Sequence, residues 1–229
     1  MRAVIIQPHF LPFAGYFELM KRADIFVYYD TAQFVRRSWH CRTYVTEQGA
    51  ARWLSVPVRT AEGSRRPLST MCWADDQSWR EKMQRRLSKL YVSTEESHLL
   101  AAIIDLINKG SSSLVNWNIA ANTLIAATLD IKRPTLKTSE LAPVAGDKQD
   151  RIIHICRDLG ATTYVCGPGS RSYVRDRDFA ESGIAVEWLD YDYEFRARTT
   201  NGIIIFPSIL DLILLKGVNT AKNEIRQKG

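Results

Sequence analysis

Residues 1–42 read MRAVIIQPHFLPFAGYFELMKRADIFVYYDTAQFVRRSWHCR, and the order of polar and apolar residues in this stretch decides the fold. Residues 1–7 form a short apolar run, which is typical of a buried strand. A loop with two prolines follows, and the helical segment at 15–22 ends in two basic residues, as helices often do. Residues 25–29 are a second apolar run. Strand, helix and strand within about 30 residues indicate a βαβ unit with parallel strands and a right-handed crossover.

Each of the two strands is followed by a polar loop, one at Pro8 and the other at Asp30. Parallel strands end at the same edge of a sheet, and open α/β sheets bind their ligands beyond that edge. Proline restricts its own backbone and that of the residue before it, so we expect the first loop to be preorganised. The two loops are therefore predicted to form one side of an active site.

The rest of the chain predicts further elements around this unit. A helical pattern dominates the middle, and the α/β pattern returns at Asp147, which suits a helix cap. The other expected elements are a hairpin over 40–45 and 52–58, a mobile loop over 60–67, helices from 76 or 78 to 90, over 99–107, over 114–129 and from 148, strands over 162–166 and 185–189, and a last helix capped by Ser208. We predict one α/β domain over residues 1–229, a Rossmann-like three-layer sandwich with a parallel sheet, plus a helical insertion over about 77–130.

The composition suits a soluble cytoplasmic protein. The chain has 229 residues, of which 45% are hydrophobic, so it can bury an ordinary core. No apolar run approaches the roughly 18 residues that cross a bilayer, and the first apolar run is too short for a signal peptide. The cysteines are widely spaced and lack a CxxC pair, so we expect free thiols and no metal site. They are Cys41, Cys72, Cys156 and Cys166.

The net charge of +6 favours an anionic partner. A phosphate-bearing small molecule, a nucleic acid and a membrane surface all have the required charge. The basic residues are scattered rather than gathered in one tract, and no helix-turn-helix, zinc-finger or RNA-binding signature is present. We therefore expect an anionic or nucleotide-activated small-molecule substrate, with an acyl carrier as a second candidate partner, and no nucleic acid.

His9 and Asp30 are the candidate catalytic residues. The ordinary pKa of histidine lies near neutrality, so His9 suits a general acid or base, or a donor to a phosphate. Asp30 is the first polar residue after the second strand and suits orienting a histidine, binding a ribose or an amine, or holding a metal. A single structural hydrogen bond for His9 and a turn-forming role for Asp30 are the alternatives.

The candidate substrate-binding residues follow Asp30 and the later strand at 162–166. An arginine offers two parallel hydrogen bonds to phosphate or carboxylate, and we favour Arg37 slightly over Arg36, with a solvated surface as the alternative. The glycines of the 167–171 loop permit close backbone approach to an anion, although a tight turn is an equal alternative and no P-loop is present. Cys166 is better explained as a buried strand residue than as a nucleophile. The predicted binding residues are Tyr16, Gln33, Arg37, Ser38, Arg42, Gly167, Ser170 and Arg171, and the aromatic residues Phe10, Phe13 and Trp39 line either a pocket or the core.

Motifs spread over nearly the whole chain carry a resemblance to a known family. They are IIQPHFLP at 5–12, Gly15-Tyr16-Phe17, Ala23-Asp24, Asp30 with Gln33, Arg37-Ser38-Trp39 with Arg42, LSVPV at 54–58, GATTY at 160–164 with Gly167, Tyr173, and Ser208 with Asp211-Leu212. In these residues the chain resembles the WbqC-like protein family. The resemblance implies a bacterial protein encoded among genes for O-antigen, as part of lipopolysaccharide, or other surface glycans, or for specialised metabolites. It implies no particular reaction, cofactor or catalytic residue. The chain differs from the usual family pattern at Phe13-Ala14, Cys41 and Cys166.

These observations together lead to one functional expectation and two alternatives. We expect a transferase that modifies an amino sugar or related amine by acyl or aminoacyl transfer. His9 would deprotonate the acceptor, Asp30 would orient it or neutralise charge, and Arg37 with the 167–171 loop would hold phosphate or carboxylate. An ATP-dependent ligase or nucleotidyl-transfer enzyme is the first alternative, because the first loop is loosely similar to that of nucleotidylyl transferases. The second is a non-catalytic partner of a glycan-assembly complex.

Overall fold

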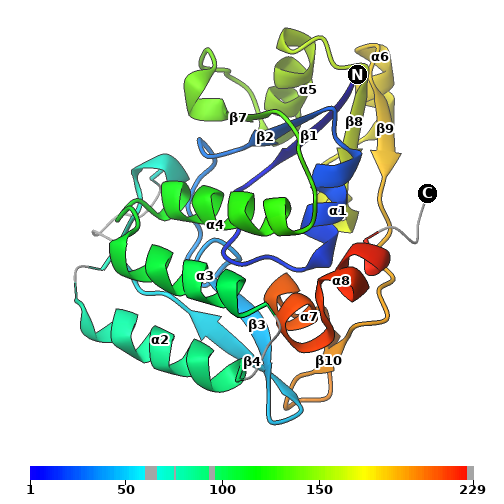
Figure 1. Cartoon of the computed structure of the whole chain (residues 1–229). Coiled ribbons are helices and arrows are strands. Elements are labelled where there is room, and N and C mark those ends of the chain that lie inside the picture. The colour runs from blue at the N-terminus through cyan, green and yellow to red at the C-terminus, as the bar shows by residue number, and fades with distance from the viewer. Residues whose placement is uncertain (60–65, 75, 93–95, 226–229) are drawn as a thin grey trace.

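The structure is a computed structural model that describes residues 1–59, 66–74, 76–92 and 96–225 (Figure 1). A five-stranded parallel sheet lies at its centre, with the order β7-β2-β1-β8-β9. Its strands are β1 Arg2–Ile6, β2 Ile25–Tyr28, β7 Thr135–Lys137, β8 Thr163–Cys166 and β9 Ala185–Trp188. Helix α1, Ala14–Arg22, joins β1 to β2. The predicted βαβ unit and the α/β class are therefore confirmed, and the sheet is compatible with a Rossmann-like fold.

The strand order places β1 at the point where the chain changes direction. The chain first builds outward from β1 through β2 to β7, and it then crosses to the other side of β1 to add β8 and β9. Arg2 of β1 therefore lies opposite Thr163 of β8, although the two strands are far apart in the sequence. In open α/β sheets, a crevice forms at the carboxyl ends of the two strands where the order reverses. This topology places the loop after β8 beside the loop after β1, on the side opposite to the segment at Asp30.

The remaining elements surround this sheet. The predicted helical section is confirmed as α2, α3 and α4, and the predicted hairpin as β3 and β4, although β3 begins later than expected. Asp147 and Ser208 cap α5 and α7, as predicted. These and the other elements are β3 Arg42–Glu47, β4 Ala50–Ser55, β5 Val58–Arg59, β6 Cys72–Trp73, α2 Ser78–Leu90, α3 Ser97–Lys109, α4 Leu114–Thr128, α5 Lys148–Asp158, α6 Asp176–Glu181, β10 Ala197–Arg198, β11 Ile204–Ile205, α7 Ile209–Lys216 and α8 Val218–Glu224. Residues 60–65, most of the predicted mobile loop, lie outside the described residues.

Two predictions from composition can be compared with this structure. The four cysteines are free, and three of them are buried, as expected for thiols that fill the core. Across the described ranges, no helix combines the length and the apolar character that crossing a membrane requires.

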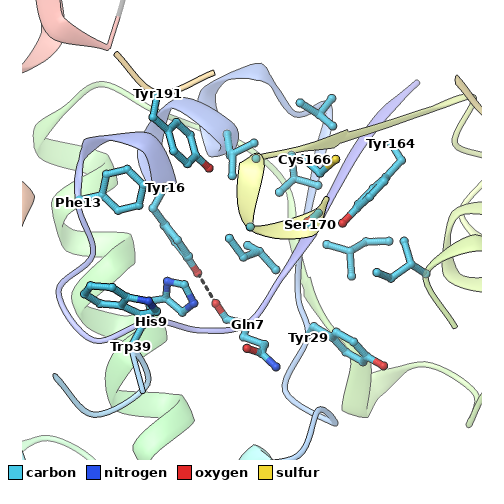
Figure 2. Close-up of a pocket in the computed structure, with 18 of the residues that line it drawn as sticks. Gln7, His9, Phe13, Tyr16, Tyr29, Trp39, Tyr164, Cys166, Ser170 and Tyr191 are labelled. Atoms are coloured by element: carbon cyan, nitrogen blue, oxygen red, sulfur yellow. Dashed lines mark hydrogen bonds between the residues drawn. The ribbon is translucent and has the colours of Figure 1, made fainter. Parts of the chain in front are cut away.

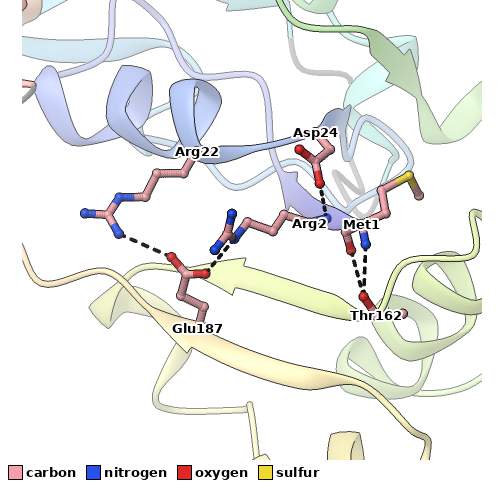
Figure 3. A network of polar contacts seen from close by, with 6 residues as sticks. All are labelled: Met1, Arg2, Arg22, Asp24, Thr162 and Glu187. Carbon is pink, nitrogen blue, oxygen red and sulfur yellow. Dashed lines mark hydrogen bonds and ion pairs between the residues drawn. The ribbon is translucent and has the colours of Figure 1, made fainter. Parts of the chain in front are cut away.

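Polar contacts tie the amino ends of the parallel strands together (Figure 3). The Arg2 backbone N–H donates to Asp24 at 2.6 Å, and the Met1 amino group donates to Thr162 Oγ1 at 2.9 Å. Glu187 accepts from both Arg2, at 3.0 Å, and Arg22, at 3.2 Å. Partly exposed ion pairs of this kind contribute about 0–1 kcal/mol each. These contacts join the first and last parts of the chain at the amino edge of the sheet.

Asp211 connects the last part of the fold to the middle section. Its carboxylate is fully buried and accepts hydrogen bonds from the Thr46 backbone N–H and from Tyr91 Oη, both at 2.5 Å. These contacts join α7 to β3 and to the end of α2. Burial raises the pKa of Asp211 to about 6, although both hydrogen bonds act in the opposite direction.

We expect this carboxyl group to make the protein less stable as the pH rises. The folded-state pKa of about 6 exceeds the ordinary value of 3.8, so the folded protein holds this proton more tightly than the unfolded chain. The contribution is fully present below about pH 4 and is lost by about pH 7, and it amounts to about 3 kcal/mol. Denaturant unfolding of the wild type and Asp211→Asn across this range would measure it. The difference between the two free energies of unfolding should change with pH, and a difference that stays constant would contradict the assignment.

Candidate functional site

A cavity of about 450 Å³ lies beyond the carboxyl ends of β1 and β8, at the point where the strand order reverses (Figure 2). Its wall comes from β1 and the loop after it, α1, the segment after β2, the start of α5, β8 and the loop after it, and the segments that follow β9. Aromatic rings form much of this wall, namely Phe13, Tyr16, Tyr29, Trp39, Tyr164, Tyr173, Tyr191 and Phe206. Cavities of about 300–1,000 Å³ with mostly apolar walls and a few polar groups are typical of small-molecule sites.

Two buried asparagines of α4 hold the first loop in place. Asn118 Nδ2 donates to the carbonyl oxygens of Pro8, at 3.1 Å, and His40, at 2.9 Å, and Asn122 Nδ2 donates to that of His9 at 3.2 Å. Both side chains are fully buried. They lie one helical turn apart and so share one face of the helix. This role was not predicted from the sequence. The feature that could have indicated it is a pair of asparagines four residues apart on an otherwise apolar helix face.

His9, a predicted catalytic residue, lies in the cavity wall. Its ring centroid is 5.3 Å from that of Tyr16 and 6.0 Å from that of His40. Burial, followed by the neighbouring His40, lowers the pKa of His9 to about 3. The imidazole is therefore uncharged near neutral pH. It can accept or donate a hydrogen bond, but it does not present a positive charge to a phosphate.

A hydrogen-bonded chain behind the cavity connects Ser38 to Gln7. The two ring nitrogens of His40 lie 2.7 Å from Ser38 Oγ and 2.9 Å from Gln7 Oε1. Burial lowers the pKa of His40 to about 4, so this ring is also neutral near pH 7. Gln7 lines the cavity, whereas Ser38 does not. Ser38, a predicted binding residue, therefore reaches the site only through His40, which the sequence analysis did not select.

Tyr16, Gly167 and Ser170, three of the predicted binding residues, line the cavity. Tyr16 is almost fully buried, and its hydroxyl donates to the backbone oxygen of Gln7 at 3.2 Å (Figure 2). Ser170 Oγ lies 2.8 Å from Tyr173 Oη, so the loop after β8 supplies hydroxyl groups to the wall. Cys166 also lines the cavity, but burial raises the pKa of its thiol to about 12. It is therefore protonated near neutral pH.

Gly167 allows the ring of Tyr191 to lie against the loop after β8. A Cβ atom at Gly167 would lie 2.0 Å from Tyr191 Oη and 2.6 Å from its Cζ. Gly15 makes similar room, because a Cβ atom there would lie 2.5 Å from the Phe13 ring and 2.7 Å from Tyr191. Gly15 and Gly167 thus determine the positions of the Phe13 and Tyr191 rings in the cavity wall.

We expect Gly167→Ala to weaken ligand binding about tenfold, because the Tyr191 ring must shift and its position shapes the cavity. The fluorescence of N-phenyl-1-naphthylamine, a neutral probe with two aromatic ring systems, would measure the affinity. Gly169→Ala is the comparison variant, because this glycine also lines the cavity but a Cβ atom there meets no protein atom within 4 Å, so the aromatic wall need not move. Equal affinities for the two variants would contradict the expectation.

The structure does not bring Asp30 into the cavity. Its side chain is 2% exposed and accepts hydrogen bonds from Thr138 Oγ1 at 3.0 Å, the Ser139 backbone N–H at 2.8 Å and Ser139 Oγ at 2.6 Å. Both carboxylate oxygens are thus used to join the end of β2 to the turn after β7. A carboxylate held in this way stabilises the sheet edge, and Asp30 is not among the residues of the cavity wall, although its neighbour Tyr29 is.

The other predicted binding residues also lie outside the cavity wall. Gln33 is exposed and forms a β-bridge with Pro67. Arg37 is exposed, with a positive φ of 53°. The Arg42 guanidinium lies 3.8 Å above the ring of Trp53, and Arg171 is exposed and forms an ion pair with Asp190 at 3.5 Å. The cavity therefore brings together His9, Tyr16, Gly167 and Ser170 from the predicted set.

Lys148 is a further cavity residue that the sequence analysis did not select. It is the first residue of α5, and its Nζ lies 3.4 Å from the centroid of the Tyr173 ring. Burial lowers its pKa. The sequence showed only that Asp147 caps a helix. This cap fixes where α5 begins but not which part of the fold the Lys148 side chain faces. Within the described ranges, no group of three or more His, Cys, Asp or Glu side chains is arranged to hold a metal ion.

Fold and site together define an α/β protein with an aromatic cavity at the carboxyl edge of its parallel sheet. The model of the WbqC-like protein family matches residues 7–223, and the chain belongs to this family. The resemblance found in the sequence motifs is thereby confirmed. The chain is also similar to the uncharacterized protein Rv1507c of Mycobacterium tuberculosis, with 28% identity over 229 residues and coverage of 94% of both chains.

Proposed function

We propose that the protein is a transferase that places an acyl or aminoacyl group on the amine of an amino sugar or a related molecule. The observation that carries this proposal is the cavity where the strand order reverses, with the neutral imidazole of His9 in its wall. Membership of the WbqC-like family supports a place in surface-glycan or specialised-metabolite biosynthesis. Both the activated donor and the acceptor amine would meet at His9.

The proposed step is an acyl transfer in which the proton passes through His9. The amine nitrogen attacks the carbonyl carbon of an ester or thioester, so a C–N bond forms and the C–O or C–S bond breaks. His9 accepts the proton that the amine loses and returns it to the departing alkoxide or thiolate. A pKa of about 3 makes His9 a weak base in the empty cavity. The negative charge that develops on the carbonyl oxygen would raise that pKa during the attack.

Asp30 and Arg37 have no part in this step. The Asp30 carboxylate already accepts three hydrogen bonds from Thr138 and Ser139. Arg37 lies on the surface outside the cavity wall. The residues that the proposal uses are His9 for the proton, and Tyr16, Gly167 and Ser170 for the shape of the binding site.

Mass spectrometry of a defined reaction would test the proposal. The purified protein would be mixed with acyl and aminoacyl thioesters, free and on an acyl carrier, together with amino sugars. We expect a new amide and release of one thiol for each amide formed. Amide formation only with ATP, accompanied by pyrophosphate or AMP, would support the ligase alternative instead. No amide from any donor, with unchanged glycan assembly when His9 is replaced, would support a non-catalytic role.

The proposal extends to the domain organisation, the layers of the fold and the location of the protein. We infer that residues 1–229 act as one domain, in which the helices of about 77–130 are an insertion that holds the first loop. Right-handed crossovers would place α1 on one face of the sheet and α5 with α6 on the other, as in a three-layer sandwich. The free cysteines are consistent with a cytoplasmic location.

A further inference from the structure

The charge of the cavity wall is concentrated at one position. Among the described residues that line the cavity, Lys148 is the single charged side chain, because His9 is neutral near pH 7. The described part of the chain contains no carboxylate in ion-pairing contact with Lys148 Nζ. Among the described residues, the face of the Tyr173 ring lies 3.4 Å from Nζ and provides its close electrostatic contact. A cation therefore faces an aromatic cavity without an acidic partner.

An anionic ligand would complete this arrangement. Lys148 is an exposed residue, so its ammonium group keeps contact with water where it borders the cavity. A cation packed on an aromatic face at such a site gains about 0.5–1 kcal/mol from that contact. Partial burial of the side chain lowers the pKa of Lys148. A carboxylate, phosphate or sulfonate bound in the cavity would form a charge-assisted hydrogen bond with Nζ.

The rest of the wall indicates what the anion is attached to. Aromatic side chains such as Phe13, Tyr16 and Tyr191 surround the space that remains. Rings of this kind favour stacked and edge-to-face contacts with another ring or with a flat apolar group. Since the described wall offers one cation, a ligand with several separated negative charges would leave some of them buried without a partner, which is unfavourable.

We propose that Lys148 is the anion-binding and specificity-determining residue of this cavity. The ligand class that it selects is a ring-bearing, largely apolar molecule that carries one anionic group. This inference rests on the proposed function only in taking the same cavity as the substrate site. It concerns the donor of the acyl or aminoacyl group rather than the polar amino sugar, and it makes no use of the acyl-transfer step.

Two fluorescent probes with the same aromatic body test this inference. 1-Anilinonaphthalene-8-sulfonate carries one anionic group, and N-phenyl-1-naphthylamine lacks it. We expect Lys148→Met to weaken binding of the sulfonate probe by about tenfold or more and to leave binding of the neutral probe within about twofold. Lys148→Arg keeps the charge and should retain most of the affinity for the sulfonate probe. Lys132→Met, an exposed lysine outside the cavity wall, is the matched control and should change neither affinity.

Competition experiments identify the anion and set the condition for rejecting the inference. Displacement of the neutral probe by 4-phenylbutyrate or phenyl phosphate, but not by 4-phenylbutanol, would support it and distinguish a carboxylate from a phosphate ligand. The inference would be overturned if Lys148→Met lost affinity for both probes equally, or if it bound the sulfonate probe as tightly as the wild type does. Near-ultraviolet circular dichroism would show that the variants are folded, with Lys148→Gln as a second neutral variant. Because no acyl transfer is measured, this test can succeed or fail independently of the amide-forming assay.

Discussion

Replacing His9 with alanine is expected to reduce the rate of amide formation by about 100- to 10,000-fold, the range over which positioned acid–base groups act. His9 would be the group in the cavity wall that takes the amine proton, and the Tyr16 ring beside it cannot replace it because burial raises the Tyr16 pKa well above 10. Steady-state kinetics with a thioester donor would measure the loss in kcat/KM. His98→Ala is the control, because the His98 side chain is exposed on α3. Full activity of His9→Ala would refute the proposed role.

The pH dependence of the same reaction gives an independent check on His9. Burial lowers its pKa from the ordinary 6.5 to about 3, so the neutral, proton-accepting form persists well below neutral pH. We therefore expect no loss of kcat/KM from this group between about pH 8 and about pH 5. An ordinary, exposed histidine base would instead lose activity as the pH fell through about 6.5. A fall in kcat/KM centred near pH 6.5 that disappears in His9→Gln would show that the His9 imidazole is not desolvated.

Replacing Asn118 with alanine is expected to lower the free energy of unfolding by about 2–4 kcal/mol. Its amide donates to the buried carbonyl oxygens of Pro8 and His40, at 3.1 and 2.9 Å. Each buried group left without a partner costs about 1–3 kcal/mol. Urea unfolding would measure the change, and Asn116→Ala is the control, because that side chain is exposed on the same helix and should contribute less than about 0.5 kcal/mol. Similar stabilities of the two variants would contradict the bracing role.

The consequences of Asn118→Ala should extend to the cavity. Asn118 holds the carbonyl oxygens of Pro8 and His40. Pro8 precedes His9 in the chain, and the ring of His40 lies beside that of His9 in space. Release of this loop would therefore weaken binding of the neutral naphthylamine probe as well as lower stability. Unchanged probe binding in a destabilised variant would restrict the role of Asn118 to stability.

Part of the site could be predicted because it depends on local pattern. A short apolar run followed by Pro8 and His9 predicted a strand end with a preorganised loop, and the structure places that loop in the cavity wall. The glycines of the 167–171 loop predicted a close approach of the backbone to an anion, and in the structure it is the ring of Tyr191 that lies against Gly167. In both cases the residues that carry the signal are neighbours in the chain.

The candidates that failed to reach the cavity show where local pattern is insufficient. Asp30 follows a strand, as a ligand-binding residue would, but its carboxylate is bound by Thr138 and Ser139. Arg37 and Arg42 have the right chemistry and lie elsewhere, one on the surface and one above Trp53. A polar side chain at a strand end has the same sequence signature whether its partner is a ligand or another part of the chain.

The sequence by itself determined helices α1 to α5 and α7, the hairpin, the βαβ unit and the family, because hydrophobic periodicity, caps and turns act over a few residues. Only the tertiary structure decided that β8 pairs with β1, with Thr163 opposite Arg2, and therefore which loops enclose the cavity. The roles of Lys148, Asn118 and His40 in the site depend on that pairing and on the packing of α4 and α5 around it. Such contacts depend on the strand order and on side chains that meet across the whole chain, and no local pattern records them.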